Sequence, residues 1–456
     1  MYHQTMVAVA DLGVIPALHV PKKGWARRLI VFGSVLAFVT NSNGWPFPYQ
    51  HLTAKPLYSA AVAIGADGER MNLPAGQQHV ALIPGSRVLV SAGAAGQLLA
   101  EEQREWLESG TVPRGSAEYQ DMVQTALLDL NTLLLPGGAA IAGWTASWRY
   151  VWPRDAAMIA LALSRTGHTN DALMVMQFLQ RQLPAGGIFQ ARYLPDGSGV
   201  PDSRGEQTDS TGWVLWAVSR MMDDLPAGGG QAEFLSQLRP LIDGSTRAAL
   251  RITDRPGGLP KPSQDYWEVH DDRLSLGTAA PLAFGLEAAA KLQNALGNTE
   301  LAGASQERAD LLRSSIDREF GKDGYPRYLG DDEPDTSIAF LLPPFTARAD
   351  PKIVKAWRNA ADKMVRPAGG LAPGAGWKGN AISWTPPTAI FALTAASIGD
   401  RPTADRWLTW LNEHRTRYGA LPESVLKNGD LSGPAPLAWT DAFVLLAVQA
   451  LGDPGS

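Results

Sequence analysis

Runs of residues with helical spacing recur about twelve times after residue 116, and this recurrence limits the possible folds most. Runs that are apolar on nearly every face alternate with runs that are apolar on one face. This alternation predicts an all-α (α/α)6 toroid, in which buried inner helices alternate with half-exposed outer helices. No short repeat period is present, which argues against an open solenoid. The runs cover 117–135, 152–166, 170–183, 209–225, 231–252, 276–296, 300–320, 335–342, 352–365, 385–398, 403–415 and 439–451.

Alternate connections between these runs are long and rich in aromatic residues, glycine and charge. In a toroid of helix pairs they would all emerge at one end. Long ordered loops at one end of a rigid scaffold are where a functional site is expected. These connections cover 136–151, 184–208, 253–275, 321–334, 367–384 and 418–438.

The residues before the helical runs have a different pattern. Short alternating apolar runs at 59–64, 79–84 and 87–91, separated by Gly, Pro and Asp, predict a small N-terminal β meander. Further upstream, four basic residues precede an apolar run at 29–39 that has the length of a signal-peptide core. This run is too short for a comfortable transmembrane helix. We expect an exported protein, secreted or at the cell surface, with three segments: a signal or targeting segment, 1–40; a β-rich segment packed on the barrel, 41–112; and the (α/α)6 domain, 113–456.

The composition excludes several kinds of site. The 456 residues contain no cysteine, which removes disulfides, thiolate catalysis and zinc–thiolate sites. The seven histidines do not occur at metal-ligand spacing, so we expect no metal and no cofactor. The formal charge of −5 gives no reason to expect a nucleic acid or a membrane surface as a partner.

The stretch 148–155, Trp-Arg-Tyr-Val-Trp-Pro-Arg-Asp, combines aromatic rings with charged groups just before an apolar helical run. A sugar ring stacks its C–H faces on aromatic rings while its hydroxyls donate and accept hydrogen bonds, so the stretch is typical of a sugar site. A structural explanation fits equally well. Arg154 and Asp155 could form an ion pair in the first turn of a helix whose first residue is Pro153.

Two glutamates lie among apolar or aromatic neighbours in two of the long connections. Glu268 ends the sequence Gln-Asp-Tyr-Trp-Glu at 264–268, and Glu423 lies in Gly-Ala-Leu-Pro-Glu-Ser at 419–424. Such surroundings desolvate a carboxyl group and raise its pKa toward the value that a general acid needs. Two carboxyl groups that flank a glycosidic bond are the minimal apparatus for its hydrolysis. Each glutamate alone could instead be a capping or ion-pairing residue.

Several motifs together resemble the glucoamylase family, glycoside hydrolase family 15. They occur in the family's order from Trp148 to Trp439, so the resemblance covers the whole helical region. The motifs are Trp-Pro-Arg-Asp at 152–155, Gln-Thr-Asp at 207–209, Asp-Tyr-Trp-Glu at 265–268, Asp-Thr-Ser at 335–337, Pro-Glu at 422–423 and Pro-Leu-Ala-Trp at 436–439.

The resemblance implies an exo-acting, inverting α-glucosidase with Glu268 as general acid and Glu423 as general base. The carboxyl groups of an inverting pair are expected to lie about 6.5–9.5 Å apart, which leaves room for water. The resemblance further implies that Arg154 and Asp155 hold hydroxyls of the terminal glucose, that Trp152 and Trp267 form pocket walls, and that Asp265 is the carboxylate of the acid loop. The substrate-binding residues that we expect are Trp148, Trp152, Arg154, Asp155, Asp209, Asp265, Trp267 and Trp384.

The sequence also departs from the family pattern. Val269 stands where fungal members have a second glutamate, and Trp148 stands where a phenol is usual. The connection 367–384 lacks the arginine that often binds the leaving sugar. We therefore expect a small soluble α-glucoside as substrate, either an α-1,4 or α-1,6 oligosaccharide or α,α-trehalose. The alternatives are a phosphorylase on a similar toroid and a non-catalytic sugar-binding protein.

Overall fold

The computed structural model describes residues 55–76, 80–114, 117–226, 229–269, 272–378 and 381–452. All of them belong to one compact unit, Pro46–Ser456. The expected signal or targeting segment at 1–40 lies outside the described residues. Where the chain is described, no helix is both long enough and apolar enough to cross a lipid bilayer.

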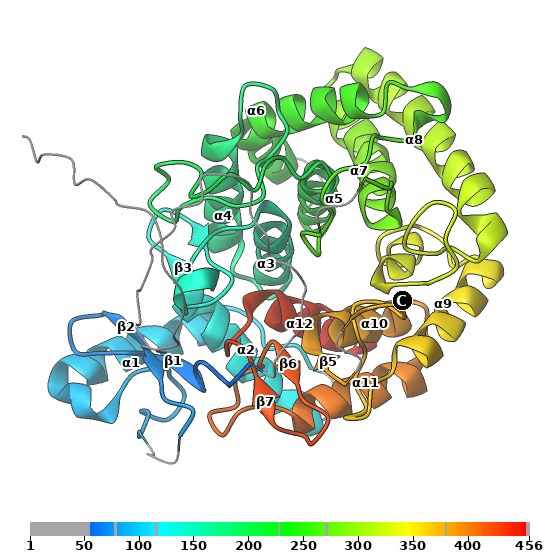
Figure 1. Cartoon of the computed structure of the whole chain (residues 1–456). Helices are drawn as coiled ribbons and strands as arrows, with labels where there is room; N and C mark the ends of the chain where they lie inside the picture. The colour runs from blue at the N-terminus through cyan, green and yellow to red at the C-terminus, as the bar shows by residue number, and fades with distance from the viewer. Residues whose placement is uncertain are drawn as a thin grey trace, which may run out of the picture. The chain divides into compact units, whose positions relative to one another are not determined.

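Most of the described chain is helical, as the spacing of apolar residues predicts (Figure 1). Eleven α-helices follow residue 117 within the described residues, and each coincides with one of the predicted runs. They are α2 (Gln120–Leu133), α3 (Pro153–Arg165), α4 (Thr169–Gln182), α5 (Asp209–Asp224), α6 (Gly229–Ile252), α7 (Leu276–Ala295), α8 (Thr299–Glu319), α9 (Pro351–Met364), α10 (Thr385–Ser397), α11 (Arg401–Glu413) and α12 (Ala438–Gly452).

The helices form two layers that correspond to the two kinds of run. The inner segments contact one another in the order α3, α5, α7, η6, α10 and α12, and α12 contacts α3 again, which closes a ring. The outer helices α4, α6, α8, α9, α11 and α2 each pack on an inner segment (Figure 1). Nearly every residue of α7, α10 and α12 is buried, because these helices are covered on all sides. The expectation of a helical ring is thus confirmed.

The inner segment at 335–342 differs from the prediction. The structure has a 3-10 helix there, η6 (Thr336–Leu341), in place of the expected α-helix. The Asp335 side chain accepts a hydrogen bond from the Ser337 N–H at 2.9 Å and caps the first turn. Pro343 and Pro344 follow closely, and proline cannot donate a backbone hydrogen bond to continue a helix.

Two inner helices touch through their backbones. A Cβ atom added to Gly212 of α5 would lie 2.0 Å from the Pro281 carbonyl oxygen of α7. A Cβ atom added to Gly285 of α7 would lie 2.4 Å from the Gly212 Cα. Only glycine permits so close an approach, so these positions fix how α5 and α7 pack.

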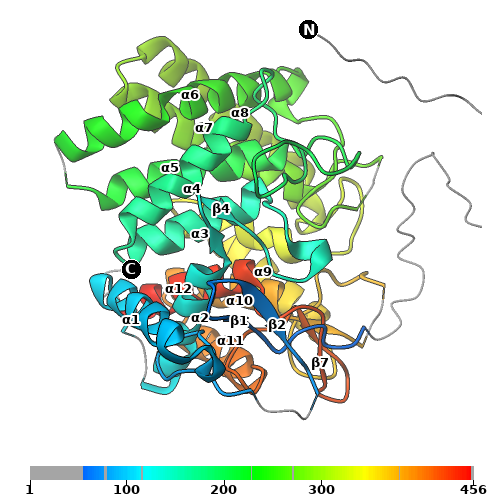
Figure 2. The same cartoon turned by 90° about the vertical axis from the view of Figure 1, so that its left-hand side faces the viewer.

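The N-terminal part of the described chain is partly helical. Strand β1 (Ala61–Ile64) pairs with β2 (Arg70–Leu73) in an antiparallel hairpin, and the predicted runs at 79–84 and 87–91 contribute only isolated bridges. His79 lies outside the described residues. Helix α1 (Gly93–Ser109) follows, and we did not predict it. Both β1 and α1 contact α2 (Figure 2).

Short strands join the loops that precede the inner helices. Strands β3 (Leu134–Leu135) and β4 (Ala139–Ala140) form one pair. Strands β5 (Ser383–Trp384), β6 (Ser424–Val425) and β7 (Leu431–Ser432) form a sheet in that order. This sheet fixes the loop that carries Trp384 beside the loop that carries Glu423.

Residues 55–60 run alongside the 432–435 loop. The Tyr58 N–H donates to the Gly433 carbonyl at 2.8 Å, and the Gly433 N–H donates to the Pro56 carbonyl at 3.1 Å. The Ser59 hydroxyl donates to the Ala435 carbonyl at 2.7 Å. The start of the described chain is therefore bound to the loop that precedes α12.

A buried ion pair attaches the segment after β2 to the helices. The Arg87 guanidinium lies 2.6 Å from the Asp129 carboxylate of α2 and donates to the Tyr418 carbonyl at 2.8 Å. Burial and the neighbouring Asp129 raise the pKa of Asp441 in α12 well above its ordinary value. Both effects favour the protonated form of Asp441, which lessens the repulsion between two carboxyl groups buried near each other.

Candidate active site

The predicted site residues gather at the amino-terminal ends of the inner segments. Arg154 and Asp155 lie in the first turn of α3, and Asp209 is the first residue of α5. Trp384 immediately precedes α10. The other predicted residues lie in the loops before α3, α7 and α12, as the alternation of long and short connections predicts. Helix amino termini carry unpaired N–H groups and a partial positive charge, which favour carboxylates and hydroxyls at this end.

Glu268 is held by two donors. Its Oε1 accepts a hydrogen bond from the Trp152 indole N–H, and its Oε2 accepts an ion-paired hydrogen bond from the Arg204 guanidinium. The side chain keeps 20% of its surface exposed. The backbone of Glu268 has a φ of 55°, which is rare for a residue other than glycine and costs about 1–3 kcal/mol. Strained backbone of this kind is often found at functional sites, where the surrounding structure holds the residue in place.

Glu423 lies in a more apolar setting and is half-buried. Burial raises its pKa to about 7, while the Lys55 ammonium and a hydrogen bond from the Trp148 side chain partly oppose that rise. The Gly433 backbone packs against the carboxylate, since a Cβ atom there would lie 2.6 Å from Oε2. The predicted rise of the pKa by apolar surroundings is therefore confirmed for Glu423.

The two glutamates take hydrogen bonds from tryptophans of the same stretch. Trp152 donates to Glu268, and Trp148 hydrogen-bonds to Glu423. Four residues of extended chain span at most about 14 Å, so both carboxyl groups face one short segment. Tyr58 packs on Trp148 with ring centroids 5.8 Å apart, and its phenol also interacts electrostatically with Glu423.

Arg154 and Asp155 form the predicted pair. The Arg154 Nε lies 2.9 Å from the Asp155 Oδ1, and its NH1 donates to the Gln207 side chain at 3.4 Å. The Arg154 guanidinium also lies 4.9 Å from the centre of the Trp439 ring. Burial raises the pKa of Asp155, against the effect of Arg154. Pro153 is the first residue of α3, so the ion pair lies in the first turn of that helix as expected, and both of its members interact electrostatically with Glu268.

Asp209 is fully buried at the start of α5. Burial raises its pKa to about 7, Arg154 opposes the rise, and Asp265 adds to it. Among the described residues, no side chain donates a hydrogen bond to either carboxyl oxygen. A carboxyl group with a pKa of about 7 is present in both its protonated and its ionised form near pH 7, so it can donate or accept a hydrogen bond with a sugar hydroxyl.

Indole rings form a continuous aromatic wall beside Glu268. The Trp267 ring packs at 6.5 Å from Trp384, 6.2 Å from Trp439 and 5.7 Å from Trp377. This wall connects the loop of Glu268 to the loop of Trp384, which is paired with that of Glu423. Trp377 was not among the predicted site residues, because its connection shows no motif.

A buried ion-pair network anchors the loop of Glu268. Arg327 NH2 lies 2.8 Å from the Asp265 Oδ2, and its NH1 lies 2.7 Å from the Asp335 Oδ2. The Tyr266 hydroxyl donates to the same Asp335 oxygen at 2.8 Å. Burial raises the pKa of Asp265, while Arg327 opposes that rise. Arg327 was not predicted, because only the fold brings it between these carboxylates.

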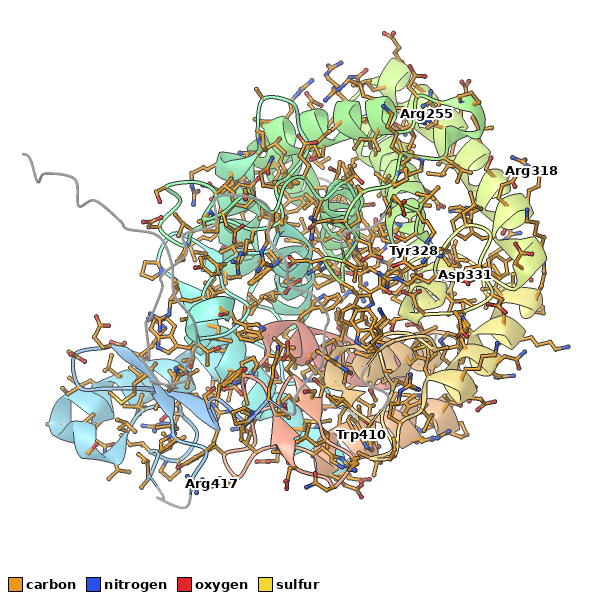
Figure 3. All side chains as sticks on the ribbon, in the orientation of Figure 1. Arg255, Arg318, Tyr328, Asp331, Trp410 and Arg417 are labelled. Atoms are coloured by element: carbon orange, nitrogen blue, oxygen red, sulfur yellow. The ribbon has the colours of Figure 1, made fainter. Side chains whose placement is uncertain are left out.

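A cavity of about 350 Å³ borders this network. Its lining contains Tyr328 and Asp331, which Figure 3 labels, together with Val269 and Trp377. Val269 directly follows Glu268, so the cavity begins beside the loop that carries Glu268. Within the described residues, no group of three or more His, Asp or Glu side chains is arranged to hold a metal ion.

Comparisons with known proteins agree with this fold. No family model matches the chain. An uncharacterized glycosyl hydrolase of Methanocaldococcus jannaschii is 25% identical over 243 residues, which are 51% of this chain and 37% of that protein. The match therefore spans well under half of the relative's length.

Two solved structures are similar along most of the chain. A variant of a glycosidase in complex with glucose has a TM-score of 0.64 and 23% identity, covering 74% of this chain and 99% of that one. A bacterial glucoamylase complexed with acarbose has a TM-score of 0.62 and 18% identity, covering 78% of this chain and 58% of that one. At these identities the likeness establishes a shared helical toroid fold.

Proposed function

We propose that this chain is a glycoside hydrolase of the glucoamylase type, family 15, and that it releases β-glucose from the non-reducing ends of short α-glucosides. The observation that carries the proposal is the pair Glu268 and Glu423, each hydrogen-bonded to a tryptophan of the 148–155 stretch. In this proposal the fold is an (α/α)6 toroid whose fourth inner position is the 3-10 helix η6.

The chemistry needs one proton donor and one proton acceptor. Glu268, protonated, gives its proton to the glycosidic oxygen as the bond to C1 breaks. Glu423, ionised, takes a proton from water, whose oxygen forms the new bond to C1 from the opposite face. The configuration at C1 is therefore inverted. The burial that brings the pKa of Glu423 to about 7 makes it a stronger base than an exposed glutamate.

The remaining predicted residues bind the terminal sugar. Arg154 and Asp155 offer a fixed donor and acceptor pair at the start of α3. Asp209 offers a buried carboxyl group without a side-chain partner in the described chain. Trp267 and Trp384 provide ring faces on which sugar C–H groups stack. The similar structures that hold glucose and acarbose support a sugar as the partner.

The proposal extends to short α-1,4 and α-1,6 oligosaccharides and to α,α-trehalose. The departures at Val269 and in the 367–384 loop alter the surroundings of the leaving sugar and favour small substrates over starch. We also propose that the protein is exported, on the basis of the basic and apolar segment at 1–40.

A phosphorylase is the second candidate, and one observation favours it. Lys55 lies close enough to Glu423 to lower the pKa of that carboxyl, so a cation is present where phosphate would have to bind. One measurement distinguishes hydrolysis from phosphorolysis. A phosphorylase needs added phosphate and produces a sugar phosphate, whereas a hydrolase releases free glucose at a rate that is independent of phosphate.

The test is glucose release from maltose, isomaltose, trehalose and soluble starch, with the anomer followed by proton NMR. We expect β-glucose from at least one short substrate, with and without phosphate. The leaving glucose keeps its own anomeric centre and contributes α-glucose, so trehalose should give equal initial amounts of α- and β-glucose. Initial α-glucose in excess of the leaving-group contribution would contradict inversion. No turnover of any substrate, combined with glucose binding by calorimetry, would favour a sugar-binding protein.

A further inference from the structure

The contacts of Glu268 conflict with its proposed role. A general acid must carry a proton before it reacts, but both oxygens of Glu268 accept hydrogen bonds from donors. One of these donors is the Arg204 guanidinium, which is always charged and therefore favours the carboxylate. As long as this ion pair persists, Oε2 cannot offer a proton to a glycosidic oxygen.

A second acceptor for Arg204 is present two residues away. The Asp202 Oδ2 lies 3.4 Å from the Arg204 Nε, and the Arg192 guanidinium also pairs with that oxygen. The Asp202 Oδ1 is buried and has no hydrogen-bond partner in the described part of the chain. An unpaired buried carboxylate oxygen is costly, so a guanidinium that turned toward it would be stabilised there.

The backbone at this position is fixed, so only the side chain needs to move. The Arg204 carbonyl accepts a hydrogen bond from the Gln264 side chain at 2.9 Å, which attaches it to the loop that carries Glu268. The Arg204 side chain keeps 15% of its surface exposed, so solvent borders part of it. A rotation about its side-chain bonds would exchange the partner Glu268 for Asp202.

On the basis of the function proposed above, we propose that Arg204 is a positioning residue that controls whether Glu268 is protonated. In the resting state Arg204 pairs with Glu268 and keeps it ionised. When a substrate occupies the site, Arg204 turns to the free oxygen of Asp202, and Glu268 takes up a proton from water. Arg204 stays charged throughout, and Glu268 then donates that proton to the leaving oxygen.

Other charged groups also face Glu268. Arg154 and Asp155 act on it from α3, and they form their own ion pair, so their effects on Glu268 largely cancel. Asp202 contacts Arg204, with its Oδ2 3.4 Å from the Arg204 Nε. Arg204, in direct contact with Oε2, is therefore the group whose removal most favours the protonated form.

The test compares Arg204→Met and Arg204→Lys with the wild type. Two substrates are used: maltose, whose leaving oxygen needs a proton, and α-glucosyl fluoride, whose fluoride leaves with little acid assistance. The pH dependence of kcat/KM reports the ionisation of the free enzyme, where the ion pair exists. For maltose, Arg204→Met should move the alkaline limit of kcat/KM upward by about one pH unit, since a nearby cation is lost. Arg204→Lys should restore the limit, and the fluoride rate should change little.

Asp202→Asn supplies an independent variant with the opposite effect. It removes the negative charge of the alternative partner, so Arg204 should remain on Glu268, and kcat for maltose should fall while the fluoride rate is kept. Arg165→Met is the matched control. It breaks a pair of similar exposure, 3.0 Å from Asp224, at the far end of α3, and it should leave both pH profiles unchanged.

The outcomes separate this inference from the proposed function. If the wild type releases glucose from both substrates but neither variant alters the pH profile or the ratio of the two rates, Arg204 is only structural. Equal losses on both substrates at every pH would also overturn the inference. If the wild type releases glucose from none of maltose, isomaltose, trehalose and the fluoride, the proposed function is wrong and the inference is wrong with it; if it cleaves isomaltose or trehalose in place of maltose, that substrate replaces maltose in the comparison.

Discussion

Replacing Arg327 with Met should destabilise the fold, because Arg327 is the cation between two buried carboxylates. Its side chain is 9% exposed, and those of Asp265 and Asp335 are 2% and 1% exposed. Removing one partner of a buried ion pair costs about 3–5 kcal/mol. At ~2.1 cal/mol/K per residue, a chain of 456 residues has an unfolding entropy of about 1 kcal/mol/K. The expected loss in Tm at pH 7 is therefore about 3–5 °C.

The loss should depend on pH with a defined sign. Burial already raises the pKa of Asp265 above its ordinary value of 3.8, and Arg327 limits that rise. Without Arg327 the pKa of Asp265 in the folded state rises further. A carboxyl group whose folded-state pKa is raised destabilises the fold as pH increases through that pKa. The difference in Tm between wild type and variant should therefore be largest near pH 7 and should shrink toward pH 4.

Thermal unfolding followed by circular dichroism at several pH values measures this effect. Arg358→Met is the control, because Arg358 forms a surface pair with Asp400 at 2.9 Å and is 59% exposed. Such pairs contribute about 0–1 kcal/mol, so the control should change Tm by about one degree at most. A Tm for Arg327→Met within a degree of wild type at pH 7, or a loss that is independent of pH, would refute the reasoning.

Four further predictions concern catalysis and packing. Glu268→Gln should lower kcat for maltose by about 10²–10⁴-fold while calorimetry still detects glucose binding. Glu423→Ala should suppress hydrolysis, and added azide should restore turnover by taking the place of the attacking water, with glucosyl azide as the product. Lys55→Met should raise the pKa of Glu423 above about 7, because Lys55 lowers it, so the acidic limit of kcat/KM should move to higher pH. Gly212→Ala should lower Tm more than an alanine at exposed Gly303, because its Cβ would meet the Pro281 carbonyl at 2.0 Å.

The inner helices were predictable because burial on every side leaves a plain pattern. The sequence of α10 has apolar or small residues at nearly all positions, and the structure buries nearly all of them. Helix α1 was missed because its exposed Gly, Glu and Gln residues give only a weak apolar stripe. The prediction of an α-helix at 335–342 was wrong, because the spacing of apolar residues alone does not distinguish a short 3-10 helix such as η6 from an α-helix.

The candidate site was predictable only where its residues form motifs along the chain. Trp152, Arg154 and Asp155 are close in sequence, and the structure keeps them close in space. Arg204 and Lys55 stand alone in the sequence, and only the fold brings them to the two glutamates. Arg204 is ion-paired with Glu268, and Lys55 opposes the rise that burial causes in the pKa of Glu423, so motifs alone left out charged groups that contact or act on both carboxyl groups.

The bond between residues 55–60 and the 432–435 loop has a consequence for how the protein folds. The Ser59 hydroxyl and the Ala435 carbonyl are separated by 376 residues, so their contact is among the most non-local that the chain can form. Such contacts form late, because the entropy of closing so long a loop must be overcome first. During synthesis, residues 55–60 must wait without their partner until the 432–435 loop is made. The surroundings of Glu423, which include Lys55 and Gly433, are therefore completed at the end of folding, and a nascent chain that already has most of its helices should still be inactive.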